Sequence, residues 1–250
     1  MKKIDNLFQE LVKQAKKDPN VLGLILGGSR GKGLITKASD YDVNLVVKNS
    51  CVKKCEREYG RYDVKGIDPV VYSLSAFDRY AAWGSPEAWD RYDFFQAKVL
   101  VDKTNGKIKK IAAEKGKIPK SKIKFVVVNS LGGYLNSVFR SFKCHRDKSK
   151  FAARLEAVES IYYFLSAIFA LEGRLRPYHK YLEWELKKHP IKKWPWGGTK
   201  TVGRLIHILE KGDVKTQKEL LTVVEKTFRK HGYRQVFEDW KDELKWMKGF

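Results

Sequence analysis

Long apolar runs, a signal-peptide core and internal repeats are all missing from this 250-residue sequence. The apolar stretches at residues 21–26 and 161–171 are too short to span a bilayer, which needs ~20 consecutive apolar residues. The first residues are charged and lack the apolar segment of a secretory leader. We therefore expect a cytoplasmic protein with no membrane partner.

Cysteine is scarce: Cys51, Cys55 and Cys144 are odd in number and lack the spacing of a disulfide framework. Reduced thiols are the simplest interpretation. Cys51 and Cys55, taken with five scattered histidines, do not repeat a zinc-finger spacing, so a structural zinc is not expected.

Negative charge is also in short supply, because 51 basic residues face 29 acidic ones and leave a net charge of +22. The excess is evenly spread, with +11 over residues 1–125 and the same over residues 126–250. Such a surface attracts phosphates and nucleic acids, although a lysine-rich surface that serves solubility or thermal stability is an equal alternative. The 43% hydrophobic content excludes a disordered chain.

The chain changes its pattern half-way, which predicts two domains, at residues 1–118 and 119–250. The first half alternates helical and strand patterns, and the second half is helical throughout. The lysine-rich stretch 107–124, with Gly116 and Pro119, is interpreted as the passage between domains. We expect a first helix at residues 4–17, strands at 21–26, 41–47, 67–74 and 99–101, a helix starting at Ser85-Pro86, and later helices at 125–142, 150–171, 178–188, 202–209, 217–231 and 236–247.

A glycine turn and two aspartates carry the chemistry of the first half. Gly27-Gly28-Ser29 follows the buried strand 21–26, and it offers backbone N–H groups and a hydroxyl to a polyphosphate. Asp40 and Asp42 lie two residues apart on an extended segment, so their carboxylates project to one side and can share divalent metal ions. The combination favours a metal-bound nucleoside triphosphate.

This arrangement resembles the nucleotidyltransferase superfamily, which has the fold of DNA polymerase beta. Gly28-Ser29 precedes Asp40 by about ten residues, and the stretch Ser39-Asp40-Tyr41-Asp42 is similar to the family's serine-aspartate-x-aspartate motif. The resemblance implies an α/β N-terminal domain with a small mixed sheet, followed by an all-α helical bundle. It also implies two Mg²⁺ ions, with Asp40 and Asp42 as catalytic metal ligands and Gly28 and Ser29 at the triphosphate.

Family members usually carry a third carboxylate on a later strand. Asp68, in the stretch Ile67-Asp68-Pro69-Val70, is the preferred candidate, as a metal ligand or as the general base for the acceptor hydroxyl. Asp63 is its competitor, and Pro69 directly after the acid suits an edge strand or a bulge.

The second half resembles the helical half of small-molecule, antibiotic-type nucleotidyltransferases over residues 171–182. The resemblance implies that Lys180 binds the triphosphate, with Arg176 as a weaker candidate, since an ammonium suits phosphate as a point charge. Arg30 and Lys32, just after the glycine turn, could also reach phosphates. A catalytic base from the second half is an open alternative, and its candidates are Glu156 and Glu159.

We therefore predict an enzyme that transfers a nucleoside monophosphate from a triphosphate, with ATP as the expected donor, to a hydroxyl of a small-molecule acceptor and releases pyrophosphate. The +22 charge disfavours polycationic acceptors such as aminoglycosides. Transfer to RNA and a non-catalytic nucleotide-binding role are the alternatives, and nucleic acid stays open as a partner. The sequence does not determine the oligomeric state.

Overall fold

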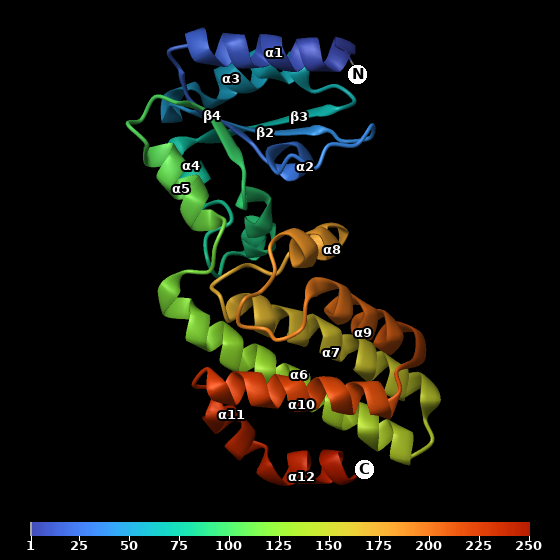
Figure 1. Cartoon of the computed structure of the whole chain (residues 1–250). Helices are drawn as coiled ribbons and strands as arrows, with labels where there is room; N and C mark the ends of the chain where they lie inside the picture. The colour runs from blue at the N-terminus through green and yellow to red at the C-terminus, as the bar shows by residue number, and fades with distance from the viewer. Residues whose placement is uncertain (1) are drawn as a thin grey trace. The chain divides into compact units, whose positions relative to one another are not determined.

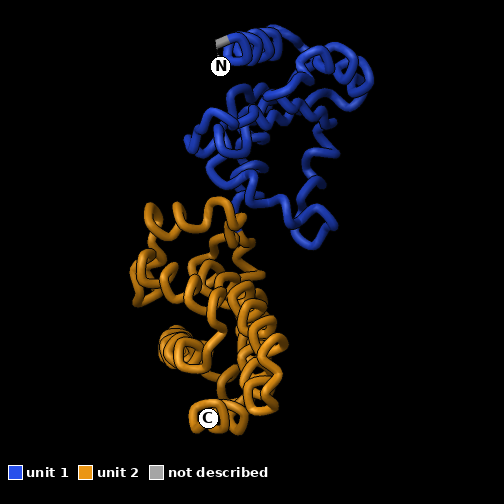
Figure 2. Tube along the Cα trace, turned by 90° about the vertical axis from the view of Figure 1, so that its right-hand side faces the viewer, with its two compact units in different colours: residues 1–117 blue, residues 118–250 orange. Residues whose placement is uncertain are grey.

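The computed structural model describes residues 2–250, which form two compact units divided between residues 117 and 118 (Figure 2). Each unit has its own core and is described by itself. Across residues 2–250, no helix is both long enough and apolar enough to cross a membrane.

The first unit is built on a four-stranded mixed sheet in the order β3-β2-β1-β4. Strand β1 pairs antiparallel with both β2 and β4, whereas β2 and β3 run parallel. The small mixed sheet predicted from the sequence is thus confirmed. Its strands are β1 (Val21–Leu26), β2 (Tyr41–Val47), β3 (Ile67–Ser73) and β4 (Lys98–Asp102).

Helices cover both faces of this sheet (Figure 1). One face packs against α1 (Lys2–Lys17) and α3 (Val52–Tyr59), whose buried side chains join those of β1 and β2 in one core cluster. The other face packs against α4 (Leu74–Arg79) and α5 (Lys107–Lys115). Because strand side chains alternate between faces, this second face also receives the even-numbered residues of β2.

Four parts of the first unit differ from the sequence prediction. The stretch 107–124 is not simply a passage between domains: its first half is α5, because Ile108, Ile111 and Ala112 form one apolar helix face that packs on the sheet. The segment starting at Pro86 is a 3-10 helix, Pro86–Phe94, rather than an α-helix. Helices α3 and α4 were not predicted, since few of their residues are apolar.

Lys115, at the end of α5, is buried with only 4% of its surface exposed. Its Nζ donates hydrogen bonds to the carbonyl oxygen of Asp78, at 2.9 Å, and to that of Tyr80. Burial, helped by the nearby Arg91 charge, lowers the pKa of Lys115 to about 8. The folded protein therefore releases this proton at a lower pH than the unfolded chain does.

This lowered pKa predicts a pH-dependent stability. Between the folded and the ordinary pKa the unfolded chain binds more protons, so stability rises with pH in that window. Relative to Lys115→Met, we expect the wild-type free energy of unfolding to gain about 1–2 kcal/mol between pH 7.5 and 9.5. Urea unfolding at several pH values measures it. Lys110→Met removes an exposed lysine of the same helix and should show no such trend; equal trends for both variants would contradict the prediction.

The second unit is all-helical, as predicted. Helices α6 and α7 pack along each other and form its centre (Figure 1). The predicted helix 236–247 is instead two helices that break at Trp240, and Trp240 and Trp246 both pack edge-on against Phe139 of α6. The helices are α6 (Ile123–Arg146), α7 (Lys150–Ala170), α8 (His179–Lys188), α9 (Gly198–Lys211), α10 (Val214–Lys230), α11 (Arg234–Asp239) and α12 (Lys241–Gly249).

Candidate functional site

The glycine turn follows β1 and leads into α2 (Gly28–Gly31), a single helical turn. The Gly27 N–H donates to the Asp42 carbonyl oxygen at 2.9 Å, which ties the turn to the neighbouring strand. Gly28 has a φ of +54°, and a Cβ there would lie 1.7 Å from Asp42 Oδ2. Only glycine allows both this backbone conformation and this approach to the carboxylate.

Two of the three predicted acids are direct neighbours across the sheet. Asp42 of β2 and Asp68 of β3 are register partners on parallel strands, so their side chains project from the same face. That face is the one covered by α4 and α5, since Val46 of β2 and Tyr72 of β3 share their orientation and pack there. Asp42 is half-buried and Asp68 is exposed.

Asp40 lies just before β2 and is exposed. Its charge contributes to the raised pKa of Asp42, as does that of Asp68. The fold therefore brings all three predicted carboxylates to one edge of the sheet beside Gly28. Their roles as metal ligands stay predictions.

Asp93 is a fourth acid at this place, and sequence reasoning missed it. It comes from the 3-10 helix Pro86–Phe94, and its Oδ1 accepts a hydrogen bond from the Gly28 N–H at 2.6 Å. Its other oxygen is 2.1 Å from where a Cβ on Gly27 would lie. No local motif marks Asp93, because its contact with the turn spans 65 residues.

Lys32 provides the positive charge inside this cluster. The residue is 8% exposed, and its Nζ donates to the backbone oxygens of Gly28, at 3.3 Å, and Asp93, at 3.2 Å. These bonds hold the turn against the 3-10 helix. The sequence suggests only that Lys32 could reach phosphates, whereas the fold gives it backbone partners and two nearby carboxylates, Asp42 and Asp93.

The site has an excess of negative charge, because four carboxylates lie near a single ammonium group. Burial, followed by the charges of Asp93, Asp68 and Asp40, raises the pKa of Asp42 to about 6, and Lys32 only partly opposes this. Burial also raises the pKa of Asp93, against Lys32 and the Gly28 N–H. A group of anions that disfavour one another's charge is stabilised by a cation.

Arg30, the next candidate for a phosphate contact, lies buried at the end of the turn. Its Nε donates to the Ser39 carbonyl oxygen at 2.9 Å, and its guanidinium lies 3.8 Å from the centre of the Tyr41 ring and 3.7 Å from Asp5. Ser39 Oγ in turn accepts from the Thr36 N–H at 2.8 Å. These contacts hold the loop that delivers Asp40, and phosphate binding by Arg30 stays a prediction.

The candidates of the second half lie in the second unit. Lys180 is exposed at the start of α8, with its Nζ 5.6 Å from the centre of the Tyr181 ring. Arg176 stacks over Tyr162 at 4.2 Å. Glu156 forms an ion pair with Arg140 at 2.5 Å, while Glu159 is exposed on the same helix, α7. Phosphate binding by Lys180 and base catalysis by these glutamates stay predictions.

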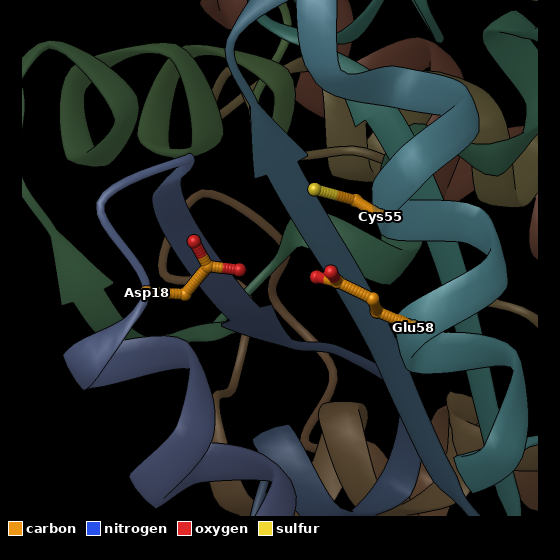
Figure 3. A group of neighbouring side chains, drawn as sticks. All are labelled: Asp18, Cys55 and Glu58. Atoms are coloured by element: carbon orange, nitrogen blue, oxygen red, sulfur yellow. The ribbon is translucent and has the colours of Figure 1, made fainter.

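The donor set of the carboxylate cluster fits Mg²⁺, which prefers oxygen ligands and few protein carboxylates. The ligand oxygens of Asp40, Asp42 and Asp68 do not all lie within 4.8 Å of one another. Within residues 2–250, the group that does meet this distance is Asp18, Cys55 and Glu58 (Figure 3).

That second group lies on the α1 and α3 face of the sheet, opposite the carboxylate cluster. Its acids already have partners within the fold: Asp18 Oδ1 accepts from the Asn20 N–H at 2.8 Å, and Glu58 pairs with Lys54 at 3.7 Å. Burial, followed by the charges of Asp18 and Glu58, raises the pKa of the Cys55 thiol to about 11. The group is therefore explained by the packing of α1 on α3.

The model of the nucleotidyltransferase domain family matches residues 5–158. This chain belongs to that family of enzymes. The match spans Gly28, Ser29 and the four aspartates of the cluster, so the nucleotidyltransferase domain includes the whole site in the first unit. Lys180 lies outside it.

A solved structure of a nucleotidyltransferase-like protein from Exiguobacterium sibiricum 255-15 is similar with a TM-score of 0.41 and 9% identity, covering 98% of this chain and 89% of that chain. No curated protein matches this nucleotidyltransferase.

Proposed function

We propose that this nucleotidyltransferase moves a nucleoside monophosphate from a Mg²⁺-bound triphosphate, with ATP as the expected donor, to a hydroxyl of a small-molecule acceptor, and releases pyrophosphate. One observation carries the proposal. Asp42 and Asp68 are register partners on parallel strands, and the Gly28 turn packs directly against Asp42. Carboxylates that could bind a metal ion therefore lie next to a turn that could bind phosphates.

In this mechanism the turn binds the triphosphate. The Ser29 hydroxyl and those N–H groups that Asp93 does not hold are the donors for phosphate oxygens. Asp93 and Lys32 keep the turn in place, because both bond to Gly28. A turn held in advance loses little entropy when the nucleotide binds.

Asp40, Asp42 and Asp68 would hold the two Mg²⁺ ions. Bound Mg²⁺ neutralises charge on the transferred phosphoryl group and makes the acceptor hydroxyl more acidic. Asp68 is the exposed member on β3, so it is also the acid best placed to accept the hydroxyl proton from an arriving acceptor.

The acceptor must approach a protein whose net charge is strongly positive, although the carboxylate cluster itself is negatively charged. The carboxylates of that site are committed to metal binding in this proposal, so they leave no net attraction for a polycation. A neutral or anionic acceptor is therefore favoured over an aminoglycoside. Transfer to RNA is the second candidate, and the evenly spread net charge of +22 supports it, because a basic surface attracts a polyanionic acceptor.

The test is incubation of the full chain with each of the four α-labelled ribonucleoside triphosphates, Mg²⁺ and a cell extract. We expect a labelled acceptor and pyrophosphate release, both abolished by EDTA. Separation of the labelled products by size distinguishes a small molecule from RNA. Triphosphate binding with no labelled acceptor and no pyrophosphate for any nucleotide would contradict transfer and favour the non-catalytic alternative.

Asp68 and Asp63 provide a matched pair, since both are exposed aspartates five residues apart. We expect Asp68→Asn to lower kcat by at least ~100-fold, because it removes a metal ligand or base, while Asp63→Asn stays within about twofold of wild type. Pyrophosphate release under saturating triphosphate measures both. A large loss of kcat in Asp63→Asn with little loss in Asp68→Asn would assign the role of metal ligand or base to Asp63.

A further inference from the structure

The second unit has a pocket of about 550 Å³ that the nucleotidyl transfer does not use in any step above. One wall is the loop between α8 and α9, and the other is the C-terminal half of α10. This volume is that of an ordinary small-ligand site. Its lining contains four lysines, one histidine and two tryptophans, and no carboxylate: Lys192, Lys193, Lys226, Lys230, His231, Trp194 and Trp196 are among them.

The lysines of α10 are arranged as a pair. Lys226 and Lys230 are four residues apart, so both project from one face of the helix, and both are exposed. Across residues 2–250, no carboxylate lies within 4.0 Å of the ammonium groups of Lys192, Lys226 or Lys230. The acid on the same stretch of α10, Glu225, pairs with Arg229 and Lys248 instead.

The tryptophans form a rigid aromatic wall. Trp194 is 5% exposed, and its Nε1 donates to Thr201 Oγ1 at 3.0 Å, which fixes the ring. Trp196 is half-buried and packs edge-on against Trp194, with 5.5 Å between the ring centres. Lys200 Nζ lies 4.7 Å from the Trp196 ring centre. Trp196 is therefore an aromatic surface that is held in place before any ligand arrives.

Unpaired ammonium groups beside a fixed indole match the two chemical parts of a nucleotide. Phosphates bind lysines as point charges, and a base stacks on an aromatic ring. We propose that this pocket, the lysine–tryptophan pocket, binds a nucleotide with its phosphates at Lys226 and Lys230 and its base against Trp196. The nucleotide is either free or part of a single-stranded RNA. This proposal goes beyond nucleotide transfer and does not depend on it.

The test uses the full chain in EDTA, so that metal-dependent binding at the carboxylate cluster does not contribute. A fluorescently labelled twelve-nucleotide oligouridylate is titrated at several salt concentrations, and unlabelled ATP, oligouridylate and inorganic triphosphate serve as competitors. We expect Lys226→Gln/Lys230→Gln to weaken binding by roughly tenfold and to lower the slope of log K against log salt by about 1.4, since each phosphate contact to a single strand contributes about 0.7.

The matched control is Lys241→Gln/Lys245→Gln, which removes two exposed lysines with the same spacing from α12 of the same unit. We expect it to bind like wild type. A loss as large as that of the α10 pair would show diffuse attraction to a basic surface and would overturn the proposal.

Substitutions of Trp196 test the proposed stacking of the nucleotide base. We expect Trp196→Ala to weaken binding by about tenfold and Trp196→Phe to restore most of it, because any aromatic ring supports stacking. Thermal melting confirms that each variant is folded. Competition by ATP identifies a free nucleotide, and competition by the oligonucleotide alone identifies RNA. Inorganic triphosphate that competes as well as ATP, together with undiminished binding by Trp196→Ala, would overturn the nucleotide assignment.

Discussion

Asp42→Asn is expected to abolish Mg²⁺-dependent nucleotide transfer while the protein stays folded. The amide keeps the shape of the side chain but loses the charge that binds a cation. We expect the rate to fall by at least ~10³-fold, equivalent to about 4 kcal/mol of lost transition-state stabilisation. Pyrophosphate release with the acceptor at saturation measures this loss.

The same substitution should not destabilise the protein. Asp42 is half-buried among Asp40, Asp68 and Asp93, whose charges disfavour its own, so the neutral amide removes a repulsion. We expect the melting temperature of Asp42→Asn in EDTA at pH 8 to equal or exceed that of wild type. Turnover near the wild-type rate would contradict the mechanism, and a large fall in melting temperature would contradict the electrostatic description.

Gly28→Ala is the second substitution with a large expected effect. Its Cβ would lie 1.7 Å from Asp42 Oδ2, so either the carboxylate or the turn must move. Misplacement of a reacting group by ~1 Å costs about 100-fold in rate, and we expect a loss of at least this size. Alanine at a left-handed φ also costs roughly 1–3 kcal/mol of stability.

Gly33→Ala separates these two effects. Gly33 also has a positive φ, +76°, but no atom lies within 4 Å of its Cβ position. The variant should therefore show a similar loss of stability in urea unfolding while its kcat stays within a few-fold of wild type. Equal losses of activity in the two variants would mean that backbone strain, and not the approach to Asp42, limits the reaction.

The positions of the strands along the chain and the position of the motif were predictable because they depend on local patterns. Strands 21–26 and 41–47 follow from short apolar runs with alternating polar residues, and the structure has both with the same bounds. Asp68 was chosen over Asp63 from its apolar neighbours. The structure places Asp68 opposite Asp42 on a parallel strand, and its role as metal ligand or base stays a prediction.

The parts that were missed depend on contacts between distant segments. The lysine-rich stretch that begins at residue 107 was interpreted as a linker because its charge obscured the apolar face of α5. Lys115 is buried only because the backbone carbonyls of Asp78 and Tyr80 lie beside it. Asp93 was missed because its hydrogen bond with the Gly28 N–H spans 65 residues.

The sequence by itself determined the family, through Gly28-Ser29 and the Asp40 and Asp42 spacing, because a turn and a strand next to it are encoded within a few residues. Only the tertiary structure added Asp93, which reaches the Gly28 N–H from 65 residues away, and only the fold showed that Lys32 bonds to the backbone oxygen of Asp93 and helps to hold the turn in place. It also assembled the lysine–tryptophan pocket from α10 and a separate loop. Hydrogen bonds and ion pairs form between groups that are close in space. Residues far apart in the sequence become close only when the chain folds, so their separation in the sequence does not predict these contacts.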